Sequence, residues 1–179
     1  RKVWLLPVLC ALAVVVLLTV ILPRPAYALR GGIIYVDHAA TGANSGTSWG
    51  DAYTSLQSAL AACTGACEIW VAHGEYTPGN DIENRFTVQA GMALYGGFAA
   101  TETLRTQRDW TANVTVLSAD IDNNDIKTPT GVITDADNIR GRNAYHVFYL
   151  DGVANDITSA TVIDGFSVTG ANTDMGTVA

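Results

Sequence analysis

The sequence is poor in basic residues. Ten lysines and arginines face seventeen aspartates and glutamates, which gives a formal charge of −7. Three of the basic residues lie within the first 28 positions and all the acidic residues lie beyond them, so residues 29–179 carry −10. This balance argues against nucleic acid and anionic membranes as partners, because both bind basic surfaces. It suits an extracellular surface and divalent cations.

Cysteine is also scarce. Beyond residue 28 the only cysteines are Cys63 and Cys67, with Gly65 between them. Two thiols without nearby histidines are too few for structural zinc, so a metal site is the least favoured interpretation. Free thiols are a second alternative. In an oxidising compartment we expect a disulfide, because Gly65 lets the chain bend enough to join the two sulfurs.

Residues arranged for catalysis are missing from the pattern as well. The three histidines, His38, His73 and His146, are scattered without ligand spacing. Arg140 and Arg142 lie near two aspartates and are typical of a solvated charged loop. We therefore predict no catalytic and no cofactor-binding residues in this segment, and we lean against an enzyme.

The first 28 residues predict export. Two basic residues precede an apolar run over 3–23, and Ala26-Tyr27-Ala28 follow it. A basic start, an apolar middle and a small-x-small tripeptide are typical of a secretory signal cleaved after Ala28. The run, at about 20 residues, is also long enough for an uncleaved membrane anchor. In both cases the positive-inside rule places the rest outside the cytoplasm, so we expect a secreted or cell-surface protein.

The rest of the chain favours short strands and one helix. Residues 51–62 place Tyr53, Leu56 and Leu60 on one stripe at helical spacing, with Asp51 or Thr54 as the capping residue. The expected strands are rich in β-branched and aromatic residues and end at Gly, Asn, Asp or Pro. They cover residues 33–36, 68–71, 85–88, 93–95, 114–117, 146–150, 161–163 and 166–168.

The spacing of these strands predicts a solenoid. Trp70, Leu94 and Leu117 lie 24 and 23 residues apart, which is the length expected for one coil. We predict an all-β, right-handed parallel β-helix with a capping helix within residues 29–68 and the first coils over 69–179. We expect it to be incomplete at the C-terminus, because no polar cap follows the last strand. An ordinary β-sandwich is the alternative on pattern alone.

Several motifs, in this order, resemble a known family. The chain resembles the amino-terminal part of large bacterial surface proteins with right-handed parallel β-helix (pectate-lyase-like) domains, some with polymorphic outer-membrane-protein-type repeats and a C-terminal anchor. The resemblance covers Ile33 to about Asn172 and implies the fold, but that family uses its scaffold for adhesins, enzymes and passengers alike. It rests on residues 34–37, 41–49, 52–60, 69–72, 76–78, 94–98, 101–103, 107–110, 120–122, 143–147 and 162–166.

Two departures from that family's pattern stand out. His73 and Glu75 occupy positions where small or neutral residues are expected before Tyr76. They bear on the local surface chemistry. Cys67 replaces an acidic residue or glycine, which strengthens the disulfide interpretation.

One segment has the composition of a calcium loop. Asp120, Asp122, Asn124 and Asp125 offer oxygen ligands at nearly alternating positions, and hard oxygens suit calcium. The glycine and glutamate of a full EF-hand are missing. Asp and Asn also populate turns because they bond their own backbone, so a structural turn is the alternative. No other cofactor is implied.

Three functions fit these features. The first is a non-catalytic surface protein that serves adhesion through a polysaccharide or another surface component. The second is a polysaccharide lyase or hydrolase with its active site on later coils. The third is an autotransporter-like passenger. We favour the first, because no catalytic set stands out.

Overall fold

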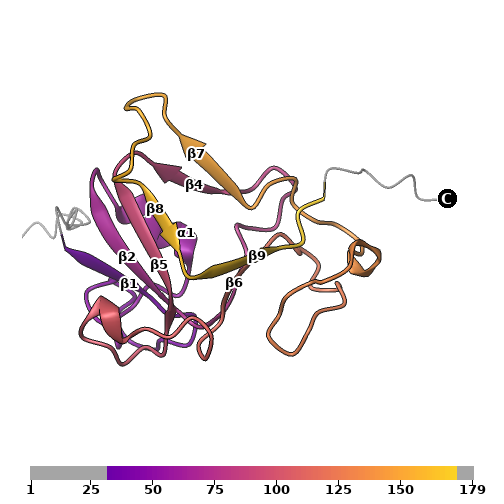
Figure 1. Cartoon of the computed structure of the whole chain (residues 1–179), viewed down its shortest axis with the longest axis horizontal. Helices are drawn as coiled ribbons and strands as arrows, with labels where there is room; N and C mark the ends of the chain where they lie inside the picture. Colours follow the sequence, from indigo (N-terminus) through magenta and orange to yellow (C-terminus); the bar gives the residue numbers. More distant parts are fainter. Residues whose placement is uncertain (1–31, 173–179) are drawn as a thin grey trace, which may run out of the picture.

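The computed structural model describes residues 32–172 and builds them almost entirely from short strands (Figure 1). One α-helix and two single-turn 3₁₀-helices complete the described part. The strands are β1 (Ile33–Val36), β2 (Cys67–Ala72), β3 (Gly74–Tyr76), β4 (Phe86–Gln89), β5 (Met92–Phe98), β6 (Thr115–Ser118), β7 (Phe148–Asp151), β8 (Val162–Asp164) and β9 (Phe166–Thr169). The helices are α1 (Leu56–Ala62), η1 (Arg105–Gln107) and η2 (Ala136–Asn138). The predicted signal segment lies outside the described residues.

The strands form three sheets, and every pairing between the strands of residues 32–172 is parallel. The sheet orders are β1-β2-β5-β8, β3-β6-β9 and β4-β7. The chain visits the three sheets in a fixed order: β2, β3 and β4 lie one in each sheet, and β5, β6 and β7 repeat the sequence. The prediction of a strand-rich chain with parallel sheets and little helix is confirmed.

The predicted strand spacing is wrong. Trp70 stands opposite Tyr95, and Leu94 stands opposite Ile69. Leu117 lies in another sheet, opposite Tyr76. The interval between partners varies with the connecting loops, because Ile69 and Leu94 are 25 residues apart whereas Leu94 and its next partner Ile163 are 69 apart. A count of residues between apolar positions therefore does not find the register.

The helix is shorter than predicted. It begins at Leu56, and its N-cap Ser55 makes no side-chain capping bond. Asp51 lies in a turn instead, and Tyr53 forms an isolated parallel bridge with β1, exchanging backbone hydrogen bonds with Tyr35 and Asp37. The Asp51 carboxylate accepts from the Ala43 amide at 2.8 Å rather than capping the helix. The buried face of α1 contacts β1 and β4.

Alternation along the strands divides the apolar side chains between two clusters. The inner cluster fills the space between the sheets and α1; among its buried members are Ile34, Val36, Leu56, Ile69, Val71, Tyr76, Phe86, Val88, Met92, Leu94 and Leu117. On the opposite face of the first sheet Trp70 stacks on Phe98 with ring centroids 4.6 Å apart, beside Tyr35, Trp49 and Tyr95. Trp70 is thus a core residue.

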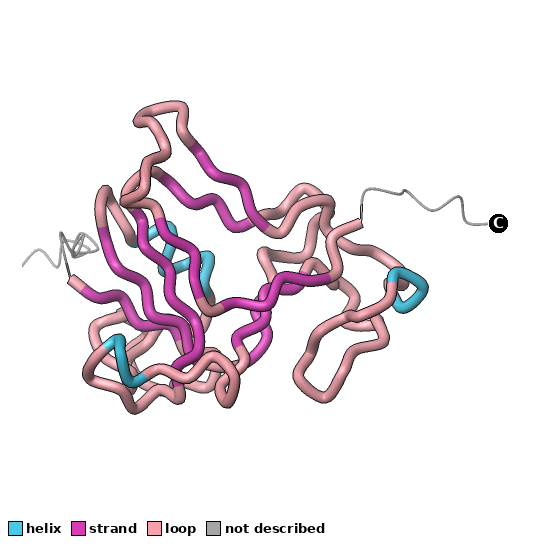
Figure 2. The backbone as a smooth tube through the Cα atoms, viewed as in Figure 1, coloured by secondary structure: helices cyan, strands magenta, loops and turns pink. Residues whose placement is uncertain are grey.

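A long loop, residues 119–147, joins β6 to β7. It extends away from the sheets and carries η2 (Figure 2). The predicted calcium segment is the first part of this loop, so its contacts fix the loop against the strands.

Candidate functional site

The four predicted calcium ligands lie at the start of the 119–147 loop, directly after β6. Asp120 is buried, and its carboxylate accepts hydrogen bonds from the amides of Asn124 and Asp125, each at 3.2 Å. This pattern is a turn that closes on its own backbone. The carboxylate is further paired with the ammonium of Lys127, whose Nζ lies 2.8 Å from Oδ2.

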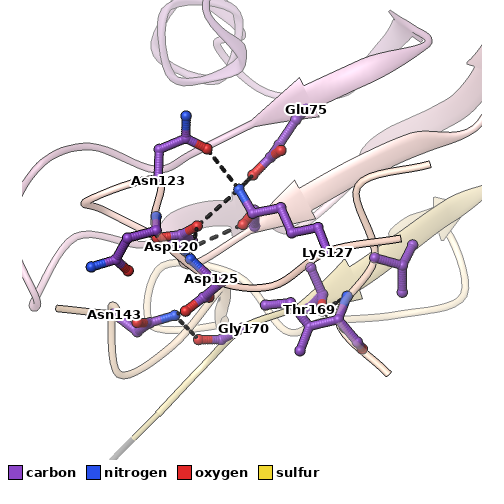
Figure 3. Close-up of polar contacts among 12 residues, drawn as sticks. Glu75, Asp120, Asn123, Asp125, Lys127, Asn143, Thr169 and Gly170 are labelled. Carbon is purple, nitrogen blue, oxygen red and sulfur yellow. Dashed lines mark hydrogen bonds and ion pairs between the residues drawn. The ribbon is translucent and has the colours of Figure 1, made fainter. Parts of the chain in front are cut away.

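Lys127 is the centre of this cluster (Figure 3). Its Nζ contacts Glu75 Oε1 at 2.7 Å and Asn123 Oδ1 at 2.8 Å, in addition to Asp120. An ammonium has three donors, so these three oxygens satisfy it completely. Its side chain is only 13% exposed. The lysine therefore ties the long loop to β3.

The buried pair of Asp120 and Lys127 is ionised. Burial alone would raise the pKa of Asp120, but the hydrogen bonds from Lys127 and from two backbone amides outweigh it, and the pKa is lowered. Burial alone would lower the pKa of Lys127, but hydrogen bonds and charge interactions with Asp120 and Glu75 outweigh it, and the pKa is raised. A protonated, fully bonded amine is not a catalytic base.

Two of the other three predicted ligands bind backbone amides of the loop, whereas Asn124 contributes its backbone amide to Asp120. Asp122 Oδ2 accepts from the Arg142 amide at 3.0 Å, and Asp125 Oδ1 accepts from the Arg140 amide. Within residues 32–172, no group of three or more His, Cys, Asp or Glu side chains converges on a metal position. This geometry favours the structural-turn interpretation, with a lysine ammonium beside the carboxylate of Asp120.

Asn143 fastens the end of the loop. Its Nδ2 donates to Asp125 Oδ2 and to the Gly170 carbonyl, both at 2.7 Å. Its Oδ1 is buried and has no hydrogen-bond partner among the described residues. The contacts of Glu75 and Asn143 were missed from the sequence. The only signal for Glu75 was that it departs from the resembled family.

A groove lies beside this cluster, on the outer face of β3. Its volume is about 360 Å³, and it is lined by His73, Gly74, Glu75, Ala112, Val114, Pro129, Thr130 and Gly131. His73, in the bend that precedes β3, and Glu75, on β3 itself, both line this groove. The next residue on β3, Tyr76, is buried in the inner cluster, and that burial raises the pKa of its phenol.

The far wall of the groove is the turn over residues 128–131. The Gly131 amide donates to the Thr128 carbonyl at 2.9 Å, and the Val132 amide donates to Thr128 Oγ1 at 3.1 Å. Lys127, immediately before the turn, anchors it to Glu75. His73 and Glu75, which differ from the pattern of the resembled family, thus line a groove whose far wall is held in place by Lys127.

Of the tryptophans among the described residues, one presents its ring to solvent. Trp110 is 58% exposed, whereas Trp49 and Trp70 lie in the aromatic cluster. The Arg108 guanidinium lies 5.2 Å from the Trp110 ring centroid and is itself paired with Asp164. Trp110 precedes the groove residue Ala112 by two positions, so an exposed aromatic ring belongs to the segment that forms the groove.

One motif was overlooked in the sequence. Gly46-Thr47-Ser48-Trp49-Gly50 has the spacing of a nucleophile elbow, which requires a strand-turn-helix context. Here the segment is a loop. The Ser48 hydroxyl accepts from the Asp51 amide at 3.1 Å, and no histidine contacts it within the described range. Ser48 is therefore not placed as the nucleophile of such an elbow.

Cys63 and Cys67 are joined by a disulfide, with their Cα atoms 6.1 Å apart. Gly65 between them has a φ of +98°, which suits glycine. The bridge connects the end of α1 to the start of β2 and closes a small turn, away from the groove.

Comparison with known proteins does not identify this site. The chain matches no protein family, no curated protein and no solved structure. Among residues 32–172, no helix combines the length and the apolar character that crossing a membrane requires.

Proposed function

We propose that this chain forms the first coils of a right-handed parallel β-helix in an exported surface protein. The repeated order of the three parallel sheets supports this architecture. Parallel crossovers are right-handed in almost all proteins. The position of α1 against β1 and β4 supports a capping role, because a helix there blocks pairing at the sheet edges.

The proposed role is non-catalytic binding of an extracellular glycan. The observation that carries it is the groove beside β3, where His73, Glu75 and Thr130 offer polar groups over an apolar floor of Val114 and Pro129. Small-ligand sites combine a largely apolar lining with a few polar groups in this way. Adhesion through the coil surface would use this groove, with the exposed ring of Trp110 as a further contact for a sugar face.

Glycan binding is tested with the secreted protein on an array of neutral, amino and acidic oligosaccharides, followed by calorimetry on the best ligand. We expect His73→Ala to weaken binding at least fivefold. His146→Ala is the matched control, because that histidine is exposed and does not line the groove. Binding that is equal in both variants, or absent for every glycan, would overturn the proposal.

Export is tested separately. We expect the mature protein in the culture medium or at the cell surface to begin at Leu29, as read by N-terminal mass spectrometry. A mature protein that retains residues 1–28 would instead indicate the uncleaved anchor.

A further inference from the structure

The two carboxylate oxygens of Glu75 have different surroundings. Oε1 is held by Lys127 at 2.7 Å. Oε2 has no hydrogen-bond partner among the described residues and lies beside Gly131, 3.6 Å from where a side-chain carbon would stand. Because Gly131 has no side chain, the turn leaves this oxygen accessible from the groove.

The charge around the groove is negative. Lys127 is shared between Glu75 and Asp120, so the three groups together carry a net charge of −1. The Asp120 side chain is wholly buried, which leaves Glu75 as the acidic group that lines the groove. The lining contains neither lysine nor arginine. The chain beyond residue 28 adds a long-range charge of −10. A polyuronate would be repelled, whereas a cationic group would be attracted.

We infer that the groove binds a glycan with free amino groups, such as a deacetylated hexosamine polymer. This inference rests on the proposed function and names its ligand class. The ammonium of the sugar pairs with Glu75 Oε2 in a charge-assisted hydrogen bond. The ring packs on Val114 and Pro129, while His73 and Thr130 offer hydrogen bonds to its hydroxyls.

The test compares three oligosaccharides of equal length: glucosamine, N-acetylglucosamine and galacturonate oligomers. We expect the wild-type protein to bind the glucosamine oligomer at least tenfold more tightly than the acetylated one, and to bind the galacturonate oligomer least. Glu75→Gln should reduce that preference to about twofold. Glu83→Gln is the matched control, because Glu83 is exposed and outside the groove.

The control separates a specific contact from general attraction. Both variants remove one charge from the same acidic chain, so general attraction to a polycation would weaken equally in both. Thr130→Lys, on the exposed turn, gives a second test that leaves the Lys127 cluster intact, and it should abolish the preference. Equal affinity for acetylated and free-amine oligomers, lost in His73→Ala, would overturn this inference while the proposed function stands. Binding to no glycan would overturn both.

Discussion

The two ends of the strand stack differ in how well they are covered. At the first end β1 is an edge strand, yet Ile34 and Val36 are fully buried. At the other end Leu150 is 49% exposed and Val168 is 53% exposed. Their register partners one strand inward, Val88 and Leu117, are both fully buried. The helix α1 contacts β1 and β4, and Figure 1 shows β7, β8 and β9 on the outside of the stack.

The difference in burial between the two ends comes from the elements packed against the end strands and not from the type of residue. The paired positions compared here hold similar apolar residues, because Val88 stands opposite Leu150 and Leu117 stands opposite Val168. A side chain on the pleated surface is buried only when neighbours on both sides, about 4.8 Å away, complete its packing. The first end obtains its missing neighbour from α1 and the loop around Tyr53. The same residue type should therefore contribute unequally to stability at the two ends.

The largest expected effect sharpens this comparison with one substitution at two places. Leu94→Ala removes a fully buried side chain that lies between two paired strands, so we expect a loss of about 3–4 kcal/mol in the free energy of unfolding. Leu150→Ala removes a half-exposed side chain with one paired neighbour and should cost about 1 kcal/mol or less. Urea denaturation midpoints measure both. Equal losses would show that the far end is covered in solution.

The next effect concerns the lysine that anchors the long loop. Lys127→Met leaves the Asp120 carboxylate buried without its cation, so we expect a loss of about 3 kcal/mol. Arg105→Met is the matched control, because Arg105 and Glu68 form an exposed pair that contributes about 1 kcal/mol or less. Denaturant unfolding gives both values. Hydrogen exchange of the amides of residues 121–143 shows whether the loss is local to the loop. A loss no larger than that of the control would contradict the role of Lys127.

The pH dependence follows from the same pair. The lowered pKa of Asp120 gives stability that is complete above the ordinary value of about 3.9 and is lost as pH falls through the folded value. The raised pKa of Lys127 gives stability that is complete below about 10.4 and is lost as pH rises through the folded value. Between these limits the pair is intact. We expect the stability gap between the wild type and Lys127→Met to shrink as pH falls from 7 to 3, because a protonated Asp120 needs no cation. A constant gap would argue against the ion pair.

Local patterns predicted most of the strands but not how they pair. Residues 33–36 and 166–168 carry β-branched and aromatic residues, and they are strands. β3 was missed because it consists of Gly74, Glu75 and Tyr76, which have little strand signal. The register of the strand pairs was missed because the loops that separate paired strands differ in length. A structural turn was the alternative to a calcium loop at Asp120 and Asp122, and both carboxylates accept from loop amides. The contact between Lys127 and Glu75, 52 residues apart, has no signature in a local pattern.

The disulfide should contribute less than the core or the buried lysine. The loop between Cys63 and Cys67 is short, so the bridge removes at most about 2 kcal/mol of chain entropy from the unfolded state. We expect the double variant Cys63→Ala/Cys67→Ala to lose about 1–2 kcal/mol and to keep the native fold. Mass spectrometry of the native protein without reduction checks the bridge itself. Alkylation of both thiols in native material would show that the bridge does not form.

The smallest expected effect is that of calcium. The Asp120 carboxylate accepts hydrogen bonds from two backbone amides and pairs with Lys127. The carboxylates of Asp122 and Asp125 accept from the backbone amides of Arg142 and Arg140, respectively. A calcium ion would have to displace these hydrogen-bond donors. It would also lie close to the ammonium of Lys127, and the two positive charges would repel each other.

We therefore expect 10 mM calcium chloride to change the melting temperature by less than 1 °C. A site with a dissociation constant of about 1 mM would instead add roughly 1.4 kcal/mol of stability, which thermal unfolding resolves as a rise of a few degrees. Magnesium at equal ionic strength controls for screening. A saturable rise with calcium that Asp120→Asn removes would restore the metal interpretation. The same rise in Lys127→Met, and not in the wild type, would show that the lysine occupies the position that the cation would take.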